Sequence, residues 1–147
     1  MRVNIYSPLP PSVSGIADYV AESLPALGRH LELHVVAEAP EEVAPAADLD
    51  LYHLGNSPPH AWVYRAACAR PGVAVLHDWS LHHLVLRETV ERGEVSAYLR
   101  EMRRAHGETG SFVGRQVARA LGGDLLPSLF PLNDRVLEGS LAVVGLT

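Results

Sequence analysis

Two adjacent residues, His77 and Asp78, are the clearest candidates for chemistry in this chain. His77 ends the apolar, strand-like segment Val73–His77, and Asp78 follows it directly. An imidazole titrates near neutral pH, so His77 can act as a general acid or base, or hydrogen-bond a sugar hydroxyl. Asp78 can orient that imidazole, bind hydroxyls itself, or cap a helix expected to begin near Ser80. The alternative for His77 is a core histidine satisfied by backbone carbonyls. Because ligands bind at the carboxyl ends of parallel strands, we predict that His77 and Asp78 are catalytic.

The same stretch, His-Asp-Trp-Ser-Leu-His-His, raises the question of a metal site. His77, Asp78 and His82 could reach one ion, with a further histidine as the fourth ligand. The spacing matches no established ligand pattern such as H-E-x-x-H, and consecutive helical residues point about 100° apart. We therefore expect no metal site and interpret His82 and His83 as surface or packing residues of a helix.

A proline-rich loop, Ser7–Gly15, follows the first strand-like segment and leads into an amphipathic helix. Its prolines fix the backbone early in the loop, and Gly15 lets the main chain approach a ligand closely. The free amides at the start of the next helix favour a phosphate, a carboxylate or a sugar hydroxyl. Neither G-x-G-x-x-G nor a P-loop pattern is present. We predict that Ser14 and Gly15 bind substrate, with a plain strand-to-helix connection as the alternative.

Asn56 and His60 follow the strand-like segment Leu49–Leu54. The pair Gly55-Asn56 suits a tight turn, because both residues tolerate a left-handed backbone. The functional alternative is an amide that holds a ligand hydroxyl, with His60 beside it. Both interpretations stay open at this point, and we predict Asn56 and His60 as substrate-binding residues.

Alternating strand and helix patterns must position these residues. Continuous apolar runs predict buried parallel strands at Val3–Ser7, Leu31–Ala37, Leu49–Leu54, Val73–His77 and Leu141–Gly145. Helical periods cover Ile16–Leu27, Pro59–Ala69, Ser80–Glu91, Val95–His106, Gly114–Leu121 and Asn133–Glu138, and residues 124–132 predict a loop packed by its own apolar side chains. We expect an α/β fold: a doubly wound, Rossmann-like parallel sheet of about five strands in the order 2-1-3-4-5, with helices on both faces. The carboxyl ends of the first, third and fourth strands then meet at one edge.

Composition limits the class of protein further. The chain has 147 residues, of which 48% are hydrophobic, enough for a single domain over residues 1–147 with a real core. The net charge of −5 and the lack of a basic stripe argue against a nucleic-acid partner. A single cysteine, Cys68, excludes an internal disulfide and fits the cytoplasm. No apolar run is long enough to cross a bilayer, although peripheral contact with a membrane stays open.

Three segments in order carry a resemblance to a known family: Pro8–Tyr19, Tyr52–Ser57 and Val75–Asp78. Together they resemble the N-terminal domain of GT-B glycosyltransferases, in particular the family-4 (group 1) retaining enzymes. Segments Tyr98–Gly107 and Leu132–Leu137 look similar to the same group, so the resemblance covers essentially the whole chain. It implies one half of a GT-B fold, in which two Rossmann-like domains face each other across a cleft, the first holding the acceptor and the second the nucleotide-sugar donor.

The resemblance also implies roles and a reaction. The Gly15 loop would approach the donor phosphate or the acceptor, His77 would close on the transferred sugar near its 6-hydroxyl, and Asn56 would line the acceptor side. The full enzyme would move a hexose from a nucleotide diphosphate sugar to a hydroxyl acceptor, with no further cofactor. The donor-binding domain and its E-x7-E motif are not found here, so we expect this chain alone to be inactive. The alternatives are a stand-alone flavodoxin-like ligand- or nucleotide-binding module and, less favoured, a His/Asp metal hydrolase.

Overall fold

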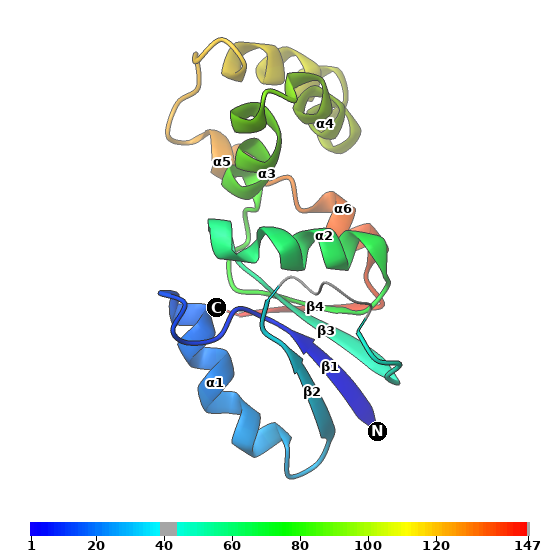
Figure 1. Ribbon diagram of the computed structural model, residues 1–147. Helices are drawn as coiled ribbons and strands as arrows, with labels where there is room; N and C mark the ends of the chain where they lie inside the picture. Colours follow the sequence, from blue (N-terminus) through cyan, green and yellow to red (C-terminus); the bar gives the residue numbers. More distant parts are fainter. Residues whose placement is uncertain (39–43, 147) are drawn as a thin grey trace. The chain divides into compact units, whose positions relative to one another are not determined.

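A computed structural model describes residues 1–38 and 44–146, which form two compact units (Figure 1). The first, here called the sheet unit, comprises the described residues of Met1–Gly55, Pro59–Asp78 and Val136–Thr147. The second, called the helical unit, comprises Asn56–Pro58 and Trp79–Arg135. Each unit has its own packing.

The sheet unit contains five parallel strands in the order β2-β1-β3-β4-β5. These are β1 (Arg2–Tyr6), β2 (Glu32–Val36), β3 (Leu49–Leu54), β4 (Val73–Leu76) and β5 (Ala142–Gly145). In the register, Ile5 lies opposite both Val35 and Leu51, while Leu54 lies opposite Leu76. The predicted α/β class, the Rossmann-like parallel sheet and its strand order are thereby confirmed. The carboxyl ends of β1, β3 and β4 accordingly share one edge.

Helices α1 (Gly15–Leu27) and α2 (Ala61–Ala69) lie on opposite faces of this sheet (Figure 1). On the α1 face, the buried side chains of Val3 and Ile5 pack with Val20, surrounded by half-buried leucines. Because side chains alternate along a strand, the neighbouring residues of β1 and β3 face α2 instead. Burial of each such aliphatic side chain stabilises the fold by about 1.5–3 kcal/mol. Packing against α1 and α2 therefore holds the sheet and its carboxyl edge in place.

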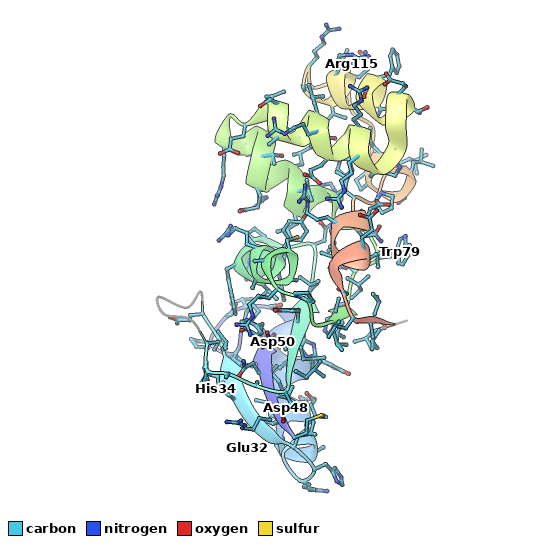
Figure 2. All side chains as sticks on the ribbon, turned by 90° about the vertical axis from the view of Figure 1, so that its right-hand side faces the viewer. Glu32, His34, Asp48, Asp50, Trp79 and Arg115 are labelled. Carbon is cyan, nitrogen blue, oxygen red and sulfur yellow. The ribbon has the colours of Figure 1, made fainter. Side chains whose placement is uncertain are left out.

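One charged residue, Asp50, is buried in the middle of this apolar framework, with 6% of its surface exposed (Figure 2). Its carboxylate lies 2.9 Å from Nη2 of Arg70 and accepts a 2.9 Å hydrogen bond from Nδ2 of Asn4. The hydroxyl of Tyr52 donates to its other oxygen. Burial, with Asp50 as the next cause, raises the pKa of Tyr52, so this hydroxyl stays protonated as a donor. The carboxylate is therefore compensated on both oxygens.

Asp50→Ala should lower the free energy of unfolding by about 2 kcal/mol, because the Tyr52 hydroxyl and one amide proton of Asn4 lose their acceptor, while Asn4 keeps its bond to the Pro45 carbonyl. Loss of Arg70 as a partner adds little, since 46% of its side chain is exposed. Urea unfolding followed by circular dichroism measures the effect. The control is Asp48→Ala, which removes an exposed carboxylate that accepts from the amide of Arg2 and should change stability by less than about 1 kcal/mol (Figure 2). Equal effects of the two substitutions would contradict this account.

The helical unit is built from α3 (His82–Thr89), α4 (Val95–Val117) and α5 (Leu126–Leu129), with a short 3₁₀ helix at Val90–Arg92; α6 (Asp134–Gly139) leads back to the sheet unit. The sequence predicted two separate helices, over Val95–His106 and Gly114–Leu121. The bounds predicted for the second helix were wrong. Gly107 alone leaves the helical conformation, with φ 59° and ψ −140°, and the helix resumes directly after it and ends at Val117. The kink needs only one residue, since glycine adopts positive φ readily.

Two smaller differences concern helix starts and the predicted loop. Residues Pro58–His60 form a 3₁₀ turn before α2, and α3 begins at His82 instead of Ser80. The segment 124–132, predicted as a loop, contains the single-turn helix α5, with Pro127 in its first turn where proline is tolerated.

In the part of the chain that the structure describes, no helix combines the length and apolar character needed to span a membrane.

Candidate functional site

Five of the six predicted site residues, all except Asn56, lie at the carboxyl edge of the sheet unit. His77 follows β4, His60 precedes α2, and Ser14 immediately precedes α1. Nδ1 of His60 lies 3.1 Å from the backbone oxygen of His53, and its Nε2 lies 3.4 Å from Oγ of Ser14. Nε2 of His77 lies 2.9 Å from Nδ1 of His53. Ser14, His60, His53 and His77 thus form one continuous polar chain.

A pocket of about 560 Å³ opens beside His77. It is lined by Gly15, Ile16, Tyr19, His77, Gly145 and Leu146. The ring of Tyr19 meets that of His77 edge-on, with centroids 5.2 Å apart and an angle of 77° between the planes. The volume falls within the range of small-molecule sites, so the pocket has room for a ligand of the size of a sugar.

Two glycines near this edge, Gly55 and Gly15, differ in the space that a side chain would have. A Cβ at Gly55 would come within 3.3 Å of the His60 ring and would meet the terminal methyl group of Ile16, which would have to move, so packing favours glycine here. A Cβ at Gly15 would meet nothing within 4 Å. Packing therefore does not require Gly15, and its bare backbone faces free space beside the pocket. A ligand in the pocket could therefore approach the main chain at Gly15 without meeting a side chain.

Burial keeps the histidines of this edge uncharged near pH 7. It lowers the pKa of His53 to about 4, with further lowering by His77 and His60. Burial also lowers the pKa of His60 and of His77, an effect that the Asp78 carboxylate partly offsets at both rings. Each neutral imidazole donates through one nitrogen and accepts through the other. The edge therefore suits hydroxyl groups better than it suits the strong negative charge of a phosphate.

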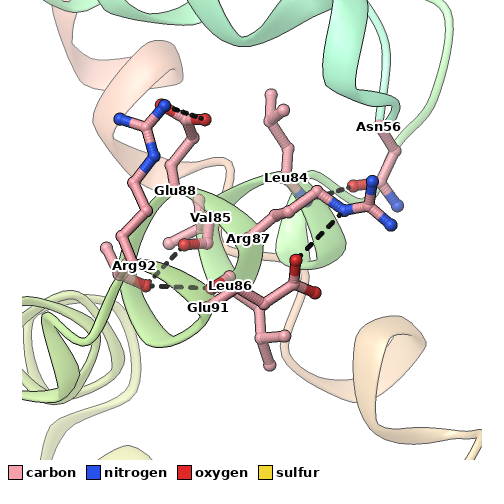
Figure 3. Close-up of polar contacts among 9 residues, drawn as sticks. Asn56, Leu84, Val85, Leu86, Arg87, Glu88, Glu91 and Arg92 are labelled. Atoms are coloured by element: carbon pink, nitrogen blue, oxygen red, sulfur yellow. Dashed lines mark hydrogen bonds and ion pairs between the residues drawn. The ribbon is translucent and has the colours of Figure 1, made fainter.

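Asn56 belongs to the helical unit, where it supports α3. Its Oδ1 accepts a 2.9 Å hydrogen bond from the amide of Leu84 (Figure 3), and Oγ of Ser80 accepts from the amide of His82. These two amides lie in the first turn of α3, so Asn56 and Ser80 satisfy them rather than Asp78, the cap considered from sequence. The same close-up shows the Arg87–Glu91 ion pair further along the helix. A ligand contact of Asn56 stays a prediction.

The metal alternative finds no ligand set in the described ranges 1–38 and 44–146, where no three His, Cys, Asp or Glu side chains could hold one ion. His82, the candidate metal ligand from sequence, is buried in the helical unit and 1% exposed. Its Nδ1 donates to the carbonyl of Phe130 over 2.5 Å, and the hydroxyl of Tyr98 donates to its Nε2 over 2.9 Å. His82 is thus a packing residue that ties the segment before Pro131 to α3 and α4.

Sequence reasoning gave no substrate role to His53 and Tyr19, which complete the pocket's polar and aromatic surroundings. A signal for His53 was available, because it lies two residues after Leu51 and four after Leu49, on the strand face that packs under α1. A polar residue at an otherwise apolar inward position, next to the end of a strand, indicates a role in hydrogen bonding or ligand binding. Tyr19 offered only its place in the second turn of α1.

In comparisons with known proteins, no family model matches this chain, and no curated protein or solved structure matches it significantly. The fold and the site define the class instead: a Rossmann-like parallel α/β domain of five strands, with a pocket lined in part by His77 at the carboxyl edge of its sheet.

Proposed function

We propose that this chain is the acceptor-side, N-terminal domain of a GT-B glycosyltransferase that moves a hexose from a nucleotide diphosphate sugar to a hydroxyl acceptor. The observation that carries the proposal is His77, an uncharged histidine that lines a pocket next to the bare backbone of Gly15. It stands at the edge of the sheet where ligands of open α/β folds bind. The order of the Pro8–Tyr19, Tyr52–Ser57 and Val75–Asp78 segments adds the family-4 resemblance.

The roles follow from the chemistry of each group. Nε2 of His77 is engaged by His53, so Nδ1 is the nitrogen left to meet a hydroxyl of the transferred sugar. The backbone at Gly15 approaches the ligand from the α1 side. Ser14 and His60 support this wall of the site through their mutual contact. The Asp78 carboxylate raises the pKa of both His60 and His77, and we assign it to orienting His77 or binding a hydroxyl.

The reaction requires positioning more than a protein nucleophile. The bond between the anomeric carbon and the diphosphate oxygen breaks, the bond to the acceptor oxygen forms, and the acceptor proton leaves with the diphosphate. Groups that bind the diphosphate belong to a donor-binding second domain, with no metal or cofactor assigned. This chain's own contribution is to hold the sugar and the acceptor close together in a fixed orientation, which accounts for a large part of the rate in two-substrate reactions. We further propose that the enzyme works in the cytoplasm.

A second candidate is a stand-alone flavodoxin-like module that binds a mononucleotide or another small ligand. The strand order favours it as well, because flavodoxin-like folds use the same order and the same switch point. The uncharged histidines at this edge argue against a mononucleotide ligand, because they provide no positive charge to bind its phosphate.

The complete product of the reading frame that contains this chain tests both candidates. It is incubated with radiolabelled nucleotide diphosphate hexoses and a panel of hydroxyl acceptors, and release of nucleoside diphosphate is followed together with labelled product. We expect transfer with retention of the anomeric configuration. Tight mononucleotide binding without any transfer would replace the proposal with the second candidate.

A further inference from the structure

We infer that His53 is a positioning residue that holds the imidazole of His77 in a single tautomer, with the proton on Nδ1, so that His77 offers the pocket a hydrogen-bond donor. This inference deepens the proposed function of the same site. The tautomer of His77 is inferred from the geometry of the sheet unit alone. Only the expected effect on turnover rests on the proposed function.

The first step is the anchoring of His53 by His60. Nδ1 of His60 lies 3.1 Å from the backbone oxygen of His53, and a carbonyl oxygen can only accept. The proton of neutral His60 therefore sits on Nδ1, and its Nε2 accepts from the hydroxyl of Ser14. His60 is 0% exposed, so water cannot compete for either nitrogen. The backbone of His53 is fixed in place at the end of β3.

The second step is the proton of His53 itself. Its Nδ1 and Nε2 of His77 are 2.9 Å apart, so one of these two nitrogens must donate to the other. Nε2 of His53 is buried and has no hydrogen-bond partner among the described residues. A proton on that nitrogen would leave a buried N–H without an acceptor, whereas a proton on Nδ1 leaves only an unfilled lone pair. Buried N–H groups without a partner are the rarer of the two in folded proteins. His53 therefore donates from Nδ1.

The third step passes this constraint to His77. Because Nε2 of His77 accepts from His53 and the ring is neutral, its single proton must be on Nδ1. The ring of Tyr19, edge-on at 5.2 Å, restrains the orientation of the His77 ring. The pocket then presents an N–H group. It selects a ligand oxygen with a free lone pair, such as a sugar hydroxyl that accepts from His77 and donates its own proton elsewhere.

Long-range ¹H–¹⁵N correlation spectra of the full chain, labelled with ¹⁵N histidine, read the tautomer directly at neutral pH. In the wild-type protein we expect a pyrrole-type Nδ1 and a pyridine-type Nε2 for His77. His53→Leu should shift most of the His77 population to the other tautomer. His53→Asn should retain the wild-type pattern, because the Asn amide nitrogen can occupy the position of the lost Nδ1 and donate in its place. His34→Leu, which removes an exposed histidine from the middle of β2, is the matched control (Figure 2).

Two outcomes overturn the inference: a wild-type His77 that carries its proton on Nε2, and a His53→Leu protein whose His77 tautomer is unchanged. If His53→Leu does not fold, the wild-type spectrum and His53→Asn decide. In the complete enzyme, His53→Leu should lower kcat about tenfold with KM changed by less than about twofold, and His53→Asn should restore most of the rate. The predicted tautomer in a protein without transferase activity would overturn the proposed function and leave the inference standing.

Discussion

Replacing His77 by alanine in the complete enzyme should lower kcat about 100-fold or more, because a positioned donor to the reacting sugar is lost from a partly enclosed site. The fold should be retained, since His77 is only half-buried and its ring hydrogen-bonds to His53 rather than to a backbone group of the sheet. KM should change less than kcat if the contact strengthens in the transition state. Steady-state kinetics with the nucleotide-sugar donor measure both constants, and circular dichroism checks the fold.

The matched control is His34→Ala, which removes an exposed histidine from β2 in the same sheet. It should leave kcat within about twofold of the wild-type value. A His77→Ala enzyme with wild-type kcat would remove His77 from the catalytic site. Equal losses in the two variants would point to a general effect on stability.

Acidification from pH 7 to pH 4 should strongly destabilise the sheet unit. Histidines of the unfolded chain protonate near pH 6.5, whereas burial lowers the pKa of folded His53 to about 4 and also lowers that of His60 and His77. Below pH 6.5 the unfolded state therefore binds more protons, so the free energy of unfolding is highest above pH 6.5 and falls toward pH 4. His53 alone accounts for a loss of about 3 kcal/mol at pH 4.

Urea unfolding at a series of pH values, followed by NMR signals of β1 and β3, measures this dependence. His53→Asn should flatten the curve below pH 6.5, because Asn does not titrate. His30→Asn, at an exposed position after α1, should leave the slope unchanged. The titratable groups that lower the pKa of His53 further are His77 and His60, and because the pKa of each of these is itself lowered, their protonation follows the same trend. A flat stability curve between pH 7 and pH 4 would contradict the buried, neutral state of these rings.

The strand pattern predicted the sheet because fully covered parallel strands read as mostly apolar runs. β4 is apolar throughout, and β1 and β3 are interrupted only by Arg2, Asn4, Asp50 and His53. The order followed from rules of connection rather than from any single residue. The helical unit was harder to predict. The break in α4 depends on one backbone conformation at Gly107, and a glycine within a helical period is equally consistent with a longer loop.

The site was predicted in part, for a physical reason. Topology alone brings the residues after β1, β3 and β4 to one edge, so Gly15 and His77 could be placed there from sequence. The hydrogen bond between His53 and His77 joins residues 24 apart in the chain and depends on side-chain geometry. Likewise, Asn56 caps α3 from 28 residues before Leu84, and no local pattern indicates that contact.

The most direct test of the central claim compares a hexose donor with its 6-deoxy analogue, in the complete wild-type enzyme and in His77→Ala. If His77 holds the transferred sugar near its 6-hydroxyl, the wild-type enzyme should lose about tenfold or more in kcat/KM with the 6-deoxy donor, while His77→Ala should use both donors almost equally. The same loss in both enzymes would show that the 6-hydroxyl is recognised elsewhere. The absence of hexose transfer altogether would contradict the glycosyltransferase account.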